Sequence, residues 1–162
     1  MKYNQIIKIL QENFSTNDFA YGELTPNDEF KCSEEVERLK EEWNAAYEAY
    51  RNHPGYNSSC LQDETYNVLL SAFRNVKSPD ALATAEFLNH LGLGEIKEVE
   101  QKGGEGEGDE WYSIKYFPKH QLWIKIDGWY TSHHGTDFDE SFDSCCKEVI
   151  PVEKTVIVYD PK

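Results

Sequence analysis

The chain has 162 residues, of which 39% are hydrophobic and 14% aromatic, and this composition excludes a disordered protein. The length is sufficient for one ordinary domain with its own hydrophobic core. A formal net charge of −14 disfavours direct binding to nucleic acid and to anionic membranes. The sequence contains no apolar run near the roughly 20 residues that span a bilayer, and its first residues lack the pattern of a signal peptide. We therefore expect a cytoplasmic protein that does not associate with membranes.

The four cysteines predict free thiols rather than disulfides. They are Cys32, Cys60, Cys145 and Cys146, and no two of them form a CxxC pair. A chain of this size with no secretion signal does not need a disulfide framework to fold.

Four stretches within the first 92 residues carry apolar residues at spacings of three and four, which predicts amphipathic helices. The expected helices cover residues 4–14, the stretch from the capping Ser33 to His53, residues 62–76, and the stretch from Pro79 to Gly92. Gly92 stands where a left-handed residue commonly ends a helix. Residues 15–31 mix glycine, proline and polar residues and are predicted to form a loop.

The remaining sequence is typical of strands. We expect strands at residues 95–100, 110–117, 122–127 and 149–159, with a Gly-rich acidic connection at residues 102–109 and a tight turn at residues 118–120. Gly128 is expected to allow a bulge or a bend, and residues 132–146 are expected to form a loop.

Helices followed by strands indicate the α+β class. The predicted fold has about four N-terminal helices packed on one face of a C-terminal four-stranded antiparallel β-meander. We expect one domain over residues 1–162, with a helical part at residues 1–92 and a sheet part at residues 94–162.

Aromatic residues concentrate in the middle strands, where they could fill the core or form a binding surface. Leu122, Ile124 and Ile126 alternate along one strand and should take its buried side. Trp123, Trp129 and Tyr130 are therefore the residues that we expect to bind a protein partner.

A second group of candidates could hold a metal ion. His133, His134, Asp137 and Asp139 follow the aromatic strand closely and carry ligand atoms, although their spacing matches neither a zinc motif nor the EF-hand order. The simpler interpretation is an acidic surface loop. The glycine-rich segment GGEGEGD lacks the lysine of a phosphate-binding loop and precedes a strand, so we expect no nucleotide site.

Three runs of the C-terminal part resemble a known group of proteins. The runs are GGEGEGDEWYSIKYF, IKIDGWYTSHHGTDFD and VIPVEKTVIVYDP, and together they belong to residues 94–162. They resemble the C-terminal part of small uncharacterised proteins from tailed bacteriophages and their hosts. The resemblance implies a phage or bacterial origin and a cytoplasmic setting, and it transfers no activity.

The sequence thus favours a non-enzymatic acidic protein that binds a protein partner or acts as an accessory factor, without a cofactor. One alternative is a metal-assisted hydrolase that uses the loop from His133 to Asp139. Another is an inhibitor that mimics nucleic acid through its acidic surface. The same aromatic face or a sheet edge could equally form a homo-oligomer.

Overall fold

The computed structural model describes residues 1–52, 79–104, 108–131, 135–139 and 141–153. The chain divides into two compact units. The sheet unit combines Met1–Glu23 with Glu95–Lys162, and the helical unit is Leu24–Gly94. The first helix therefore belongs with the sheet, whereas the sequence placed it in a helical part at residues 1–92.

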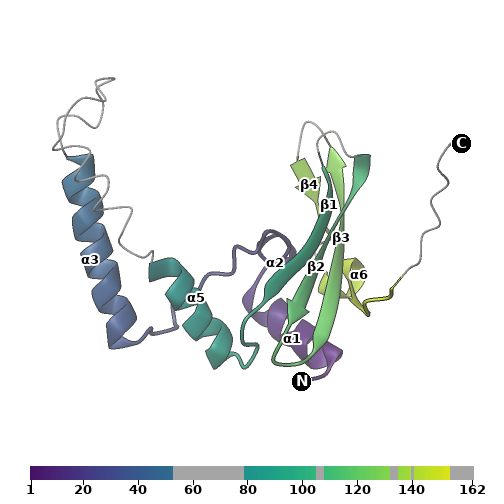
Figure 1. The fold of residues 1–162 in the computed structure, drawn as a ribbon, viewed down its shortest axis with the longest axis horizontal. Helices are drawn as coiled ribbons and strands as arrows, with labels where there is room; N and C mark the ends of the chain where they lie inside the picture. Colours follow the sequence, from purple (N-terminus) through teal and green to yellow (C-terminus); the bar gives the residue numbers. More distant parts are fainter. Residues whose placement is uncertain (53–78, 105–107, 132–134, 140, 154–162) are drawn as a thin grey trace, which may run out of the picture. The chain divides into compact units, whose positions relative to one another are not determined.

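The described elements confirm the predicted α+β class, with N-terminal helices before a C-terminal antiparallel sheet (Figure 1). They are α1 (Tyr3–Asn13), α2 (Thr16–Tyr21), α3 (Glu34–Arg51), α5 (Pro79–His90), β1 (Lys97–Gly104), β2 (Gly108–Phe117), β3 (Leu122–Thr131), β4 (Gly135–Asp137), α6 (Phe142–Cys145) and β5 (Cys146–Val149). The helix predicted at residues 62–76 lies outside the described residues. Among the described helices, none has the length and apolarity needed to cross a membrane.

The sheet is antiparallel throughout its described strands. Strands β1, β2 and β3 follow one another as a meander, and both β4 and β5 pair with β3. The path β1-β2-β3-β5 forms the predicted four-stranded meander, in which β1, β2 and β3 correspond to the first three predicted strands, while β4 and α6 are additions within the predicted loop at residues 132–146. The last strand was predicted at residues 149–159, but β5 ends at Val149, because Cys146 pairs with Ile126 and Val149 with Trp123. Residues 150–153 form no strand, and residues 154–159 lie outside the described residues. Ile150 is 75% exposed and has no regular structure.

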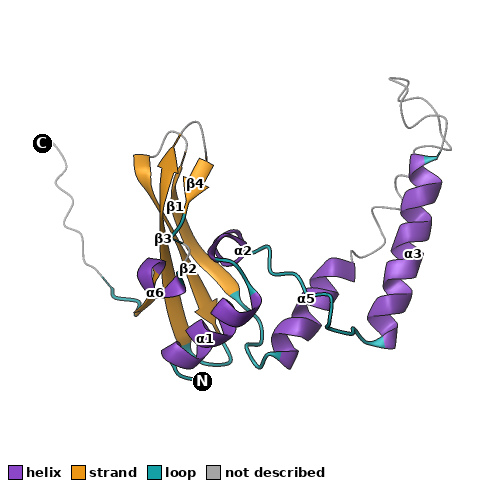
Figure 2. Ribbon diagram, turned by 180° about the vertical axis from the view of Figure 1, so that it is seen from behind, coloured by secondary structure: helices purple, strands orange, loops and turns teal. Residues whose placement is uncertain are grey.

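One face of the sheet is covered by α1, α2 and α6, which lie in front of the strands in Figure 2. This covered face follows the predicted alternation, because Leu122, Ile124 and Ile126 are all buried. Phe19 of α2 links the layers, with its ring centroid 6.3 Å from that of Phe117 and 5.7 Å from that of Phe142. The helices contribute further buried side chains, namely Ile6, Ile7, Leu10, Ala20 and Cys145.

Helix α2 lies in the stretch predicted to be a loop, and that prediction is wrong. The Ser15 hydroxyl accepts a hydrogen bond from the Asp18 backbone N–H at 3.1 Å, and the Asp18 carboxylate accepts one from the Ser15 N–H at 3.0 Å. This capping box starts the helix, and Gly22 ends it in the left-handed conformation at φ 74°. Six residues are too few to show helical periodicity, so burial of Phe19 and Ala20 decides the structure.

The helical unit confirms the predicted helix signals. The Ser33 hydroxyl caps α3 by accepting from the Val36 N–H at 3.3 Å. The Glu86 carboxylate of α5 accepts from the Ser33 N–H at 2.8 Å and so joins the two helices. Gly92 is left-handed at φ 78°, and the next N–H, of Leu93, donates to the carbonyl of Leu88 at 2.9 Å.

Candidate functional site

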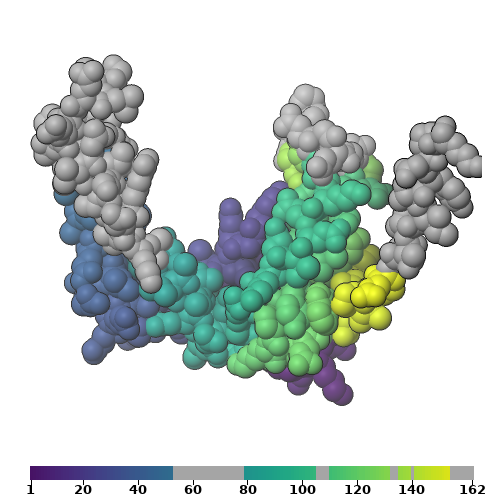
Figure 3. All heavy atoms as spheres, in the orientation of Figure 1, coloured from purple at the N-terminus to yellow at the C-terminus, as the bar shows by residue number. Residues whose placement is uncertain are grey.

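The sheet face opposite to α1, α2 and α6 carries an aromatic surface. We call this the open face, and Figure 3 shows β1, β2 and β3 at the near surface of the sheet unit in teal and green. Its side chains on β2 and β3 alternate with the buried ones, and they are Tyr112, Ile114, Tyr116, Trp123, Lys125, Asp127 and Trp129. Trp129 is the most exposed large aromatic among them, at 52%.

The predicted binding residues divide between the two faces. Trp123 and Trp129 lie on the open face, where Trp123 is half-buried. Tyr130 follows Trp129 directly and pairs with Thr136, so its side chain belongs to the opposite face. The structure therefore places the two tryptophans on the same face, six residues apart along β3, and does not include Tyr130.

A stacked aromatic pair makes part of the open face rigid. Tyr116 and Trp123 are direct partners across β2 and β3, and their ring centroids lie 4.4 Å apart with planes inclined by 22°. Cross-strand aromatic pairs of this kind stabilise a sheet and fix their own rotamers. A ligand on this surface would thus meet preorganised rings.

Charged side chains next to the rings form a network around Asp127. The Lys125 ammonium lies 4.4 Å from the Tyr112 ring centroid and also pairs with the Asp127 carboxylate. Lys147 of β5 reaches the same carboxylate at 2.5 Å. Burial raises the pKa of Asp127, but the hydrogen bonds from the two lysines outweigh burial and hold the pKa below its ordinary value.

An acidic pocket lies beside Trp129 at the edge of β3, between the places where β4 and β5 pair with it. It has a volume of about 210 Å³ and is lined by Asp127, Gly128, Trp129, Asp137, Asp139, Ser144 and Cys145. Trp129 and Asp137 are direct partners across β3 and β4. The pocket therefore combines an exposed indole with three carboxylates, of which only Asp127 has lysine partners among the described ion pairs.

Close packing of Phe138 on Gly128 holds the β4 side of the acidic pocket. A Cβ atom at Gly128 would lie 2.5 Å from Cε1 of Phe138, so only glycine admits the ring there. The Phe138 ring stands edge-on to Trp111 at 5.0 Å and edge-on to Tyr21 at 5.7 Å. Gly128 was expected to allow a bulge or a bend, and the β2–β3 register runs through it without the shift that a bulge would produce. Glycine is needed at this position because the Phe138 ring approaches the backbone closely.

The predicted metal ligands are only partly placed. Asp137 and Asp139 are exposed and line the acidic pocket, whereas His133 and His134 lie outside the described residues. Within the described ranges, no group of three or more His, Cys, Asp or Glu side chains is arranged to hold a metal ion. The metal site that includes the two histidines therefore stays a prediction.

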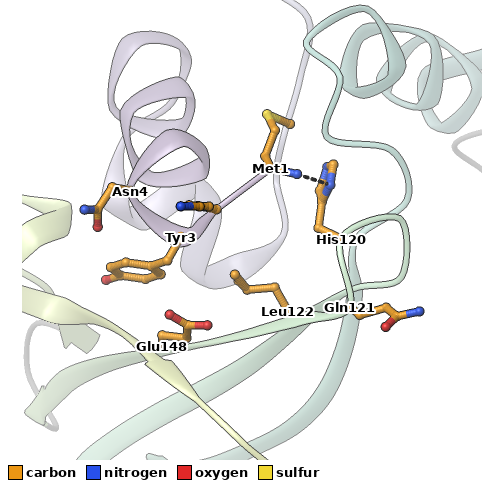
Figure 4. A pocket seen from close by; sticks show the side chains of 8 residues that line it. Met1, Tyr3, Asn4, His120, Gln121, Leu122 and Glu148 are labelled. Atoms are coloured by element: carbon orange, nitrogen blue, oxygen red, sulfur yellow. Dashed lines mark hydrogen bonds between the residues drawn. The ribbon is translucent and has the colours of Figure 1, made fainter.

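A second pocket lies where the start of α1 meets the sheet, and Figure 4 shows it. It measures about 450 Å³ and is lined by Met1, Lys2, Tyr3, Asn4, His120, Gln121, Leu122 and Glu148. The Met1 ammonium lies 2.9 Å from Nδ1 of His120, and the Tyr3 hydroxyl donates to the Cys146 carbonyl at 2.8 Å. Burial raises the pKa of Tyr3 to about 12. These groups hold α1 against the sheet, and we assign them a structural role.

Sequence reasoning missed that Asp127 lies beside Trp129. The signal was present, because residues two apart in a strand point to the same face. Cys145 could not be placed in the same pocket from the sequence, because α6 was predicted to be part of a loop.

Comparison with protein-family models, with curated proteins and with solved structures finds no match for this chain. The resemblance of residues 94–162 to bacteriophage proteins thus stays a prediction, and any function must be argued from the site.

Proposed function

We propose that the protein is a non-enzymatic binding module whose open face binds a basic segment of a partner protein. The observation that carries this proposal is the exposed indole of Trp129 beside the acidic pocket, on the sheet face opposite to the covering helices.

The aromatic side chains support a protein ligand. Tryptophan and tyrosine supply large contact areas with few rotatable bonds, and they dominate the energetics of many interfaces. Trp129 is 52% exposed, and the stack of Tyr116 on Trp123, further along the same face, is already ordered. Binding there would cost little conformational entropy.

Charge supports a basic ligand. The chain carries a formal net charge of −14, and the carboxylates of Asp137 and Asp139 are exposed at the acidic pocket. A lysine or arginine side chain of the partner can lie over the Trp129 indole and pair with these carboxylates. Lys125 on the Tyr112 ring already shows this cation–π arrangement on the same face.

The open face favours a protein partner over mimicry of nucleic acid. Mimicry requires rows of carboxylates that replace phosphates. Lys125 of β3 and Lys147 of β5 both form ion pairs with Asp127, so this surface is mixed in charge.

The test measures binding to an array of immobilised peptides of equal length with positive, neutral or negative net charge. We expect selective capture of positive peptides, with affinity that falls as salt rises. Trp129→Ala should weaken capture by about tenfold or more, as for an interface hot spot. Leu82→Ala removes another exposed apolar side chain, in the helical unit, and should leave capture unchanged.

Two outcomes would overturn the proposal. One is equal capture of positive and negative peptides. The other is unchanged capture by the Trp129→Ala variant, since the indole is the group on which the argument depends.

A further inference from the structure

Two adjacent thiols lie at the junction of α6 and β5. Cys145 is 3% and Cys146 is 5% exposed, and neither forms a disulfide. Their Sγ atoms are 3.9 Å apart, so one thiol can donate a hydrogen bond to the other. Buried cysteines at such a distance are close enough to react with each other after a small movement.

The acidic pocket gives access to one of the two thiols. Cys145 lines this pocket, whereas Cys146 does not. The Cys145 thiol also donates to the Ser141 carbonyl at 3.4 Å, which holds it at the end of α6. A small oxidant that enters the pocket would therefore meet Cys145 first.

The titration of the pair agrees with this order. The hydrogen bond with Cys145 and burial raise the pKa of the Cys146 thiol, and the nearby carboxylates of Asp127 and Asp143 add to the effect. The same hydrogen bond lowers the pKa of Cys145. Cys145 is thus the more readily ionised thiol of the two.

We propose that Cys145 and Cys146 form a reversible oxidation site for hydrogen peroxide, with Cys145 as the reacting thiol and Cys146 as the resolving thiol. The Cys145 thiolate attacks one peroxide oxygen, the O–O bond breaks, and hydroxide leaves. The product is a sulfenic acid on Cys145. The Cys146 sulfur then attacks the Cys145 sulfur, and the hydroxyl group leaves with a proton as water. Overall, two thiols and one peroxide give one disulfide and two water molecules.

The resulting disulfide should be easy to reduce. The peptide bonds of the described chain are trans, and a trans peptide holds adjacent Cα atoms about 3.8 Å apart. Ordinary disulfides join Cα atoms roughly 4.4 to 6.8 Å apart, so a ring between adjacent residues is strained. Strained disulfides have more oxidising potentials and belong to the labile class.

The experiment uses the full chain with Cys32→Ser and Cys60→Ser, which leaves only the adjacent pair. After treatment with one equivalent of hydrogen peroxide, intact mass should show the loss of two hydrogen atoms, and dithiothreitol should reverse it. Addition of Cys146→Ser should instead leave a sulfenic acid on Cys145, trapped by dimedone. Addition of Cys145→Ser leaves only the Cys146 thiol, which should react with hydrogen peroxide about tenfold or more slowly, because the accessible thiolate is gone.

Peptide mapping of the unsubstituted protein after the same treatment provides a second measurement that does not depend on how the variants fold. We expect the disulfide within the peptide that contains both residues. Retention of both free thiols after peroxide treatment, or a Cys145→Ser variant that reacts as fast as its parent, would overturn the proposal. Because peptide capture depends on Trp129, the two proposals can fail separately.

Discussion

Substitution of Gly128 by alanine tests how the acidic pocket is built. The added methyl group would lie 2.5 Å from Cε1 and 2.7 Å from Cδ1 of Phe138, far inside van der Waals contact. The ring cannot move aside freely, because it is held edge-on against Trp111 and Tyr21. We expect the methyl group to displace Phe138 and, with it, the neighbouring Asp137 and Asp139.

The expected cost follows from two effects. Overpacking a tight contact costs about 1–3 kcal/mol. Replacing glycine by alanine within a strand otherwise favours folding by about 0.5–1 kcal/mol. In a Phe138→Ala background the ring is absent and the nearest remaining atom is the Asp137 carbonyl oxygen at 3.0 Å, so the contact is less severe and the cost should be smaller.

The assay is a double-mutant cycle on the free energy of unfolding, measured by urea denaturation with tryptophan fluorescence. We expect Gly128→Ala to destabilise the protein by about 0.5–2 kcal/mol when Phe138 is present, which is the overpacking cost less the gain from replacing glycine, and by clearly less when the ring is absent. Equal costs in the two backgrounds would show that the ring is not the reason for the glycine.

Three further predictions concern the supports of the sheet unit. Tyr3→Phe removes the hydrogen bond to the Cys146 carbonyl and should cost about 1 kcal/mol at neutral pH. The pKa of the Tyr3 hydroxyl is about 12 in the folded chain and about 10 in the unfolded chain. The free energy of unfolding that this difference contributes is therefore present below pH 10 and is lost as the pH rises towards 12. Tyr3→Phe lacks the hydroxyl, so urea denaturation should show a smaller loss of its stability at alkaline pH. The buried Lys115 ammonium pairs with the Glu98 carboxylate at 2.5 Å, and Glu98→Gln would leave this ammonium buried without its carboxylate. Lys115→Met should lower the urea midpoint less, because the Glu98 carboxylate that it leaves behind is 44% exposed and can be solvated. A larger loss in Lys115→Met than in Glu98→Gln would contradict this reasoning. Ser15→Ala removes the α2 cap and should cost about 1 kcal/mol in the same assay, whereas no loss would show that packing alone holds the helix.

The acidic pocket could be predicted only in parts. Alternation along β3 placed Trp123 and Trp129 opposite to the isoleucines, because a strand repeats every two residues whatever lies around it. The same rule should have separated Tyr130 from Trp129. The meeting of Asp127 with Asp139 and Cys145 depends on how β4 and α6 return to β3, and loop residues carry no periodic signal for that path.

The sequence by itself determined the α+β class, the α1, α3 and α5 helices, the meander of β1, β2 and β3, and the free state of the described cysteines. These features depend on local periodicity, capping residues and composition, all of which are written in consecutive residues. Only the tertiary structure decided that α2 is a helix, that Gly128 admits the Phe138 ring, and that Cys145 reaches the pocket of Trp129. Each of these follows from contacts between residues far apart in the chain, and burial at those contacts overrides the weak local preference.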